Sequence, residues 1–487
     1  MVLVHGIASW NRILQVMQTP RGAIFAITLW SICILFYRLG DLAMDPDEGN
    51  ILKWSIEVYN QTPTFWSLIK YAIREHGFYQ RTNYPGLNIF VTAAFFHWFG
   101  VSLWTARLVS VLIALGVAPL FFCVARRLFH HATPALIGLV MLATSAPIIF
   151  LMRQCRYTSL TIVATLWLTW AYLEVLDRKK YGLAQLAGAA LLFFYTAFYI
   201  FLPIFIGLMA HAFWHYRGPR KRLMVGGLVL FAIGISWLTP DRIISGPTWY
   251  LSFFQKLWFM DHITVFYKLN VVFQELNMMS LPVSFILVTV FILRHKWHPY
   301  VAWGMMTVCC GVLLTLSPLG DIILKDVVAI LLDSAWPTFS PWWFNRLVDP
   351  RSWLLLFFCT GLAMFFFYGN LSSAHPVTIL IFILVGALLT YCIVPQYRMP
   401  WTRYLASSFI FGFLLAGYLV TQIMHKNKVL GMSMIVLHMT SNLLSVLPFV
   451  PGQYPYFQWK LPQWIFRLVT GDPVNDIITN FIRLPPL

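Results

Sequence analysis

The chain has 487 residues, of which 59% are hydrophobic and only 10% are charged. A soluble domain carries about 25% charged residues, so this composition excludes a soluble globular enzyme, a disordered chain and a coiled coil. Its apolar runs are continuous rather than alternating, which excludes a transmembrane barrel. Because helices satisfy their own backbone hydrogen bonds in lipid, the composition predicts an all-α polytopic membrane protein.

The net charge is +17, which in a soluble protein would suggest nucleic-acid binding. Here the basic residues are spread over short loops without a compact nucleic-acid-binding domain, so we expect no nucleic-acid partner. Basic residues in short loops keep those loops on the cytoplasmic side of the membrane, where they interact with anionic lipid headgroups. The seven cysteines form no metal-ligand or disulfide spacing. We expect no metal site and no cofactor; a divalent cation is compatible with the sequence but not indicated by it.

Apolar runs of membrane-spanning length follow a polar N-terminus. The first, about 23–39, reads as an uncleaved signal anchor. The run 87–100 is too short to cross comfortably and is expected to lie on or dip into the interface, whereas 183–215 is too long for one span and is divided near residues 195–199. Together these runs predict about 13 transmembrane helices. The spans after the first are expected near 104–125, 134–151, 158–176, 183–197, 198–215, 223–239, 280–294, 300–317, 353–369, 376–395, 403–423 and 430–449.

The distribution of charge predicts the orientation of these spans. With the N-terminus inside, the basic clusters at 126–127, 178–180 and 217–222 fall in cytoplasmic loops, as the positive-inside rule requires. Of the 17 acidic residues, only Glu174 and Asp177 then lie inside. If 87–100 spanned the bilayer, every later basic cluster would face outward.

This orientation predicts how the chain is divided. The order is a cytoplasmic N-terminus (1–21), a catalytic transmembrane module (22–239) with an external loop (40–103), an external interfacial loop (240–280), a C-terminal transmembrane bundle (281–449) with an external loop (318–352), and an external tail (450–487). The external segments are rich in aromatic residues, which favour the headgroup level.

A group of carboxylates follows the first span, in the run Asp45-Pro46-Asp47-Glu48-Gly49. A solvated turn would explain this run without any function, since such residues are ordinary in turns. Their place at the bilayer surface, ahead of the amphipathic stretch 50–59, favours a functional role. A carboxylate there can act as general base on an acceptor hydroxyl.

A set of cations is predicted on the same outer face. Headgroup snorkelling accounts for about half of them. It accounts less well for Arg153 and Arg156, because the positive-inside bias acts against them; being three residues apart, they are expected on one helical face. Outward arginines suit an anionic lipid phosphate. The set is Lys53, Arg74, Arg81, Arg107, Arg153, Arg156, Arg346 and Arg403.

These two sets fit the transfer of a sugar from a polyprenyl phosphate. The leaving lipid phosphate gains charge and needs cations to hold it, while the acceptor needs a base.

The order of these residues resembles the glycosyltransferase C superfamily, in the branch of the protein O-mannosyltransferases and the lipid A aminoarabinose transferase. The first 180 residues carry most of the resemblance, and the rest follows it by topology. The matching motifs are Asp47-Glu48 after the first helix, Tyr84-Pro85-Gly86-Leu87 where relatives often have His-Pro-Pro-Leu, Arg107-Leu108 opening the next helix, Arg153 with Arg156-Tyr157, and Arg403-Tyr404 entering a late span.

The resemblance implies an inverting, multi-pass transferase of the cytoplasmic (inner) membrane with its active site on the external, periplasmic face. Asp47 would be the catalytic carboxylate with Glu48 beside it, and the arginines would hold the phosphate or the first loop. Tyr84 replaces the family histidine, near the position of a lipid-binding lysine in the aminoarabinose transferase, so Arg81 is a candidate substitute. An aspartate expected near Ser159 in some relatives is absent. The substrate-binding candidates are Lys53, Arg81, Tyr84, Arg107, Arg153, Arg156, Tyr157 and Arg403.

Two other functions are compatible with a polytopic membrane protein of this kind. A flippase or transporter of lipid-linked glycans would place ionisable residues at mid-membrane and often show paired half-repeats. An O-antigen-type ligase would concentrate basic residues in one long late external loop. The predicted spans carry almost no charge and the Asp47-Glu48 pair comes early in the chain, which favours the transferase. The expected partners are a polyprenyl-phosphate-linked sugar, membrane lipid and an acceptor that is a lipid, glycan or protein; sugar and acceptor stay open.

Overall fold

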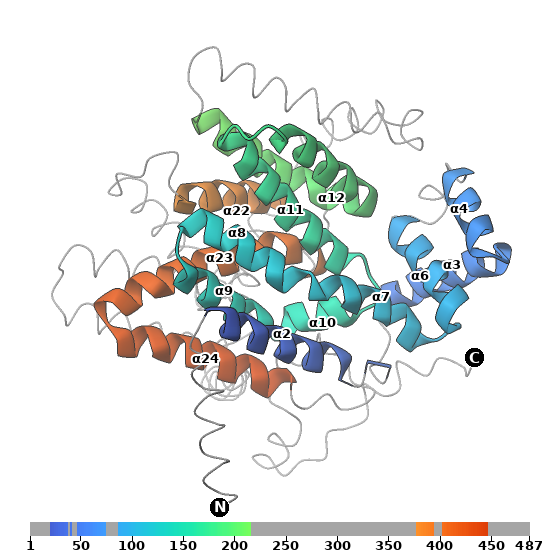
Figure 1. Ribbon diagram of the computed structural model, residues 1–487, viewed down its shortest axis with the longest axis horizontal. Coiled ribbons are helices and arrows are strands. Elements are labelled where there is room, and N and C mark those ends of the chain that lie inside the picture. The colour runs from blue at the N-terminus through green and yellow to red at the C-terminus, as the bar shows by residue number, and fades with distance from the viewer. Residues whose placement is uncertain are drawn as a thin grey trace, which may run out of the picture.

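The computed structural model describes residues 20–37, 39–40, 46–74, 86–215, 376–393 and 402–446, and its regular secondary structure over these ranges is entirely helical (Figure 1). The predicted all-α class is therefore confirmed. The spans expected near 223–239, 280–294, 300–317 and 353–369 lie outside the described residues, so the total of thirteen stays a prediction. The helices are α2 (Pro20–Phe36), α3 (Pro46–Gln61), α4 (Phe65–Arg74), α6 (Gly86–Phe99), α7 (Leu103–Leu115), α8 (Val117–Phe129), α9 (Ala132–Thr144), α10 (Ala146–Arg153), α11 (Thr158–Leu176), α12 (Gly182–His215), α22 (Pro376–Ile393), α23 (Thr402–Lys426) and α24 (Lys428–Val446).

Three described stretches are long and apolar enough to cross a membrane: Leu103–Phe129, Thr158–Leu176 and Ala406–Lys426. They correspond to the spans predicted at 104–125, 158–176 and 403–423. The first comprises α7 and α8, which join at Gly116 with a backbone that stays in the right-handed helical region (φ −72°, ψ −17°). These stretches confirm the membrane-protein class by length and composition.

The span predicted at 134–151 is not one continuous helix, because the structure divides it into α9 and α10. Ser145, between them, has an extended backbone with ψ 109°. Pro147 lies in the first turn of α10, where its missing N–H leaves no hydrogen bond unmade. The apolar composition runs across this break, which is why hydropathy does not reveal it.

The chain reverses within α12, as the two spans predicted at 183–197 and 198–215 require, although the whole of Gly182–His215 is helical. A straight helix of 34 residues would hold its ends about 50 Å apart. Both ends instead lie beside the end of α11. A Cβ on Gly182 would come within 2.9 Å of the Glu174 carbonyl carbon, and the Tyr172 hydroxyl lies 2.7 Å from Nδ1 of His211.

The stretch predicted as the first external loop is helical where it is described, and its helices α3, α4 and α6 are grouped at one edge of the molecule (Figure 1). The ring of Tyr59 on α3 meets Phe96 on α6 edge-on at 6.1 Å, and Phe65 on α4 packs against Trp98 at 5.3 Å. At 14 residues, α6 is about 21 Å long, which is shorter than the hydrocarbon core. Its interfacial placement stays a prediction.

The C-terminal helices pack onto the N-terminal ones rather than forming a separate body. Gly417 of α23 lies against Gly138 of α9, where an added Cβ would come within 2.7 Å of the Gly138 nitrogen. The carbonyl of Phe413, one turn earlier, also approaches Gly138, and Gly417 approaches Pro134. The two helices are therefore antiparallel. This register places the start of α23 at the same end of the bundle as the α9–α10 junction.

Candidate functional site

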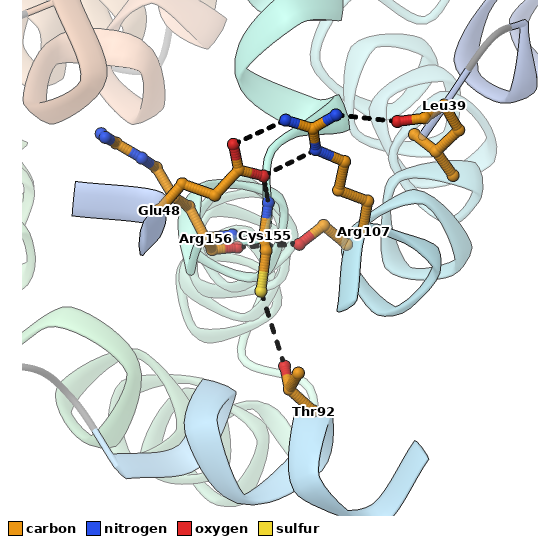
Figure 2. A network of polar contacts seen from close by, with 7 residues as sticks. Leu39, Glu48, Thr92, Arg107, Cys155 and Arg156 are labelled. Atoms are coloured by element: carbon orange, nitrogen blue, oxygen red, sulfur yellow. Dashed lines mark hydrogen bonds and ion pairs between the residues drawn. The ribbon is translucent and has the colours of Figure 1, made fainter. Parts of the chain in front are cut away.

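Four charged side chains gather where α3, α7 and the α10–α11 loop meet: Glu48, Arg107, Arg153 and Arg156. We refer to them as the arginine cluster, and Figure 2 shows its members Glu48, Arg107 and Arg156. All four are buried, and its three arginines are the largest fully buried side chains of the described part of the chain. Long arginine side chains are rarely buried without polar partners, so the contacts of each one define the site.

Glu48 and Arg107 form a two-pronged ion pair. Nε of Arg107 donates to Oε1 of Glu48 at 2.8 Å, and Nη2 donates to Oε2 at 2.8 Å. Oε1 also accepts the backbone N–H of Cys155 at 2.7 Å. Glu48 lies in the first turn of α3, where the helix dipole favours a carboxylate. The pair therefore fastens α3 to both α7 and the α10–α11 loop.

Two arginines of the cluster also hold the end of α2. Nη1 of Arg107 donates to the carbonyl of Leu39 at 2.9 Å, and Nη2 of Arg153 donates to the carbonyl of Tyr37. The last carbonyls of a helix have no partner within the helix, and cations near them are favourable. The resemblance implies that these arginines hold either the lipid phosphate or the first loop. Arg107 and Arg153 both contact the chain that leads into that loop, as the second role requires.

The α10–α11 loop is fixed to α7 through its backbone. Ser110 Oγ donates to the Arg156 carbonyl at 3.1 Å and accepts the Arg156 N–H at 3.3 Å. Ser159 Oγ closes the loop from the other side by donating to the carbonyl of Met152 at 3.3 Å. These hydrogen bonds fix the loop backbone, and they therefore also fix the positions from which the side chains of Arg153 and Arg156 extend.

The expectation that Arg153 and Arg156 share one helical face is wrong. Arg153 is the last residue of α10, Gln154 is extended with ψ 148°, and α11 starts only at Thr158. The two arginines therefore stand at the two ends of a short loop. Residues three apart share a face only within one helix. Hydropathy does not reveal that the helix ends at Arg153.

The thiol of Cys155 is buried in the loop between α10 and α11. Its Sγ lies 3.9 Å from the Thr92 hydroxyl of α6 (Figure 2). Burial, followed by the negative charge of Glu48, raises the pKa of this thiol to about 12. It is therefore a protonated thiol rather than a nucleophile at neutral pH.

The other predicted site residues fall into two groups. Asp47 is the second residue of α3 and Arg403 the second of α23, but their side chains lie outside the described ones, as do Arg81 and Tyr84 altogether. Lys53 is exposed on α3, its ammonium 5.7 Å from the ring centre of Trp54, and so stands apart from the arginine cluster.

Tyr157 is buried beside the cluster, directly before α11. Sequence reasoning missed Ser110, Thr92 and Cys155. Only Ser110 had a usable signal, because it follows Arg107 by three residues on one helix and so shares its face.

A second ionic group lies at the other end of the same helices. Arg127, near the end of α8, pairs with Glu174 and, at 2.6 Å, with Asp177 beyond the end of α11. Its guanidinium lies 4.6 Å from the ring centre of Trp170. The arginine cluster and this group therefore mark opposite ends of α7–α8 and α11, in agreement with the alternation of these spans.

Comparison with known proteins gives one family. Residues 84–238 match the model of the dolichyl-phosphate-mannose-protein mannosyltransferase family. No curated protein matches the chain significantly. The matched region includes Arg107, Arg153 and Arg156 but begins after Asp47 and Glu48. Over residues 84–238 the chain is thus similar to the dolichyl-phosphate-mannose-protein mannosyltransferases, and this match supports a membrane glycosyltransferase that uses a polyprenyl-phosphate-linked sugar.

Proposed function

We propose that the protein is an inverting glycosyltransferase of the cytoplasmic (inner) membrane. It moves a sugar from a polyprenyl phosphate to a lipid, glycan or protein acceptor on the external face. The observation that carries the proposal is the arginine cluster at one end of the helical bundle: three buried arginines, one of which pairs with Glu48, the residue that follows Asp47. The family match over residues 84–238 supports the same reaction class.

The chemistry of the cluster suits a phosphodiester that becomes a phosphate monoester. Within the described residues, the cluster combines three guanidinium groups with one carboxylate, Glu48. A guanidinium is always charged and its planar fork matches two phosphate oxygens. Arg107 is oriented by Glu48, so we assign it the role of fixing the site. Arg153 and Arg156, at the two ends of the loop, are assigned to the phosphate.

The proposed step uses Asp47 as the general base. The acceptor oxygen attacks the anomeric carbon from the face opposite the phosphate, and its proton passes to the Asp47 carboxylate. The bond between the anomeric carbon and the phosphate oxygen breaks, and its electron pair stays on the lipid phosphate. Preorganised cations hold the charge that develops there. One displacement of this kind inverts the anomeric configuration.

The frame around Asp47 supports this role. Its neighbour Glu48 is bound to Arg107 and to the Cys155 N–H, which fixes the backbone of the first turn of α3 beside the loop that carries Arg153 and Arg156. Glu48 is fully buried and engaged at both of its oxygens, so we assign it a positioning role. Arg81, Tyr84, Tyr157 and Arg403 remain proposed contacts of the lipid donor, and Lys53 a proposed contact nearer solvent.

The test is Asp47→Asn, with Asp45→Asn as the matched carboxylate control two residues away. In a strain that lacks the protein, mass spectrometry of envelope glycolipids and glycoproteins first identifies the missing sugar and its acceptor. Asp47→Asn should insert at the wild-type level yet fail to restore that sugar, with a rate loss of about 10²–10⁴-fold. Asp45→Asn should restore it. Full restoration by Asp47→Asn would show that another group is the base.

A further inference from the structure

Three buried polar side chains lie next to the arginine cluster without a hydrogen-bond partner among the described residues. They are Asn88, Gln154 and Thr158, with 2%, 1% and 0% of their surface exposed. Both amide atoms of Asn88, both of Gln154 and the hydroxyl of Thr158 are unpaired within that part of the chain. Folded proteins nearly always satisfy buried polar groups, so three such side chains around one loop need an explanation.

The segments that carry these side chains meet at one contact. The Thr92 hydroxyl of α6 lies 3.9 Å from Cys155 Sγ. Asn88 precedes Thr92 by four residues and therefore shares the face of α6 that meets the loop. Gln154 directly precedes Cys155, and Thr158 is the first residue of α11. All three therefore lie within one helical turn or three residues of the Thr92–Cys155 contact.

Neighbouring hydroxyls are satisfied, which sets the three side chains apart. Thr92 donates to the carbonyl of Asn88 at 2.8 Å, Thr161 to the carbonyl of Thr158 at 2.8 Å, and Ser159 to that of Met152. The local backbone thus supplies partners to these three hydroxyl groups but not to that of Thr158. The unpaired amides are longer and uncharged, and an amide both donates and accepts. A sugar hydroxyl, which also does both, is their natural partner.

We propose that Asn88, Gln154 and Thr158 bind hydroxyl groups of the donor sugar and so determine which sugar is transferred. The inference rests on the proposed function, which puts the donor phosphate at Arg153 and Arg156. Gln154 lies between these two arginines in the chain, and the sugar is joined directly to the phosphate, so the sugar subsite must adjoin them. The three groups are uncharged, which suits a neutral sugar. The sole described carboxylate of the cluster, Glu48, is engaged by Arg107.

The experiment uses the purified full chain in lipid nanodiscs and four probes: polyprenyl phosphate alone, and the same lipid carrying mannose, glucose or galactose. Mannose and galactose each differ from glucose at one stereocentre. Competition binding ranks the four, and transfer is measured for those sugars that react. The variants are Asn88→Leu and Gln154→Met, which remove the amides at similar volume. The matched control is Thr165→Ala, a buried hydroxyl that is already satisfied by the Thr161 carbonyl at 2.7 Å.

We expect the wild-type protein to prefer one sugar, and each amide variant to lower binding or kcat/KM for that donor about tenfold and to reduce the ratio between epimers. The amide variants should bind sugar-free polyprenyl phosphate as the wild type does. The control Thr165→Ala should leave donor binding, kcat/KM and the ratio between epimers unchanged. A retained epimer ratio in both active amide variants would overturn the inference. So would a change confined to the KM of the acceptor, because the groups would then face the acceptor.

Two further outcomes separate this inference from the proposed function. Failure of the wild-type protein to bind any of the four lipids would refute the proposed function itself. Equal binding of sugar-bearing and sugar-free lipids would refute only the sugar subsite. If the amide variants do not fold, a structure of the wild-type protein with its preferred donor decides: sugar hydroxyls within hydrogen-bond distance of Asn88 and Gln154 support the inference, and ordered water alone in that place contradicts it.

Discussion

At the scale of single residues, the cluster is organised by one buried ion pair. The Glu48–Arg107 pair is fully buried, and both oxygens of Glu48 are engaged. Removing one partner of such a pair leaves an uncompensated charge and costs about 3–5 kcal/mol. Replacing both partners with uncharged side chains of similar volume costs much less. The pair is therefore a constraint on the position of α3 more than a source of net stability.

This constraint predicts a non-additive result in a double-mutant cycle. Glu48→Gln and Arg107→Met should each lower the midpoint of thermal unfolding in detergent strongly, whereas the double variant should recover part of the loss. All three should lose transfer activity, because Asp47 is no longer held. Additive losses of stability would contradict the pair as the coupling between α3 and α7.

Cys155 gives a pH-dependent prediction. Its pKa is raised by burial, and next by the charge of Glu48, from an ordinary 9.0 to about 12. Below pH 9 both folded and unfolded states hold the thiol proton; above it, the unfolded state loses the proton first. This thiol therefore contributes stability below pH 9 that is lost as pH rises toward 12.

The measurement is alkylation followed by peptide mass spectrometry. Cys155 should stay unmodified in the folded protein from pH 7 to pH 10 and react after unfolding. A step in its alkylation between these pH values, with the fold retained, would contradict the burial of the thiol.

The residues of the site were more predictable than their partners. Asp47-Glu48, Arg107 and the two loop arginines could be selected because charge beside apolar spans is costly and therefore conspicuous. Glu48 pairs with Arg107 across 59 positions, and no local pattern encodes that choice. Asn88 and Gln154 gave no signal at all, because an uncharged amide is ordinary in any sequence until its burial is known.

At the scale of helices, hydropathy predicted lengths well and breaks poorly. The excess length of 183–215 indicated the reversal inside α12, because no single span needs so many apolar residues. The break at Ser145 was missed, since α9 and α10 are apolar on both sides of it. That break matters for the site, because it sets the direction of α10 and so the place of Arg153.

Close helix crossings give a prediction at this scale. Gly417 of α23 meets the Pro134 carbonyl and the backbone of Gly138 so closely that a side chain cannot fit without moving α9. Small residues at such crossings let helix backbones pack tightly in lipid. Gly417→Leu should therefore lower stability by about 1–3 kcal/mol or more, measured by thermal unfolding in detergent.

The control is Gly40→Ala, whose added Cβ would meet its nearest neighbour, Trp104 Cβ, at an ordinary 3.7 Å. It should leave the unfolding midpoint nearly unchanged. Equal effects of the two substitutions would show that the α9–α23 crossing is not tightly packed.

At the scale of the whole molecule, the two ionic groups define two ends. The arginine cluster lies at the end that holds α3 and the start of α11; Arg127, Glu174 and Asp177 lie at the other. The all-α class and the order of the described spans could be predicted from composition and period. The total number of spans could not be predicted, because the sequence of a short apolar helix such as α6 or α10 does not show whether it crosses the membrane.

Side-specific labelling tests this polarity. Thr64, in the α3–α4 turn, and Lys179, before α12, are both exposed. In intact cells, a membrane-impermeant maleimide should label Thr64→Cys above the parent protein but not Lys179→Cys, which should react only after permeabilisation. The reverse pattern would put the arginine cluster on the cytoplasmic side.

The most direct single measurement is the binding of polyprenyl phosphate to the purified full chain, compared between the wild type, Arg156→Ala and the exposed cation control Lys179→Ala. The cluster at Arg107, Arg153 and Arg156 predicts that Arg156→Ala binds the lipid phosphate about tenfold more weakly or worse. It also predicts that Lys179→Ala binds as the wild type does. Equal affinity in all three proteins would contradict the proposal that buried arginines hold the donor.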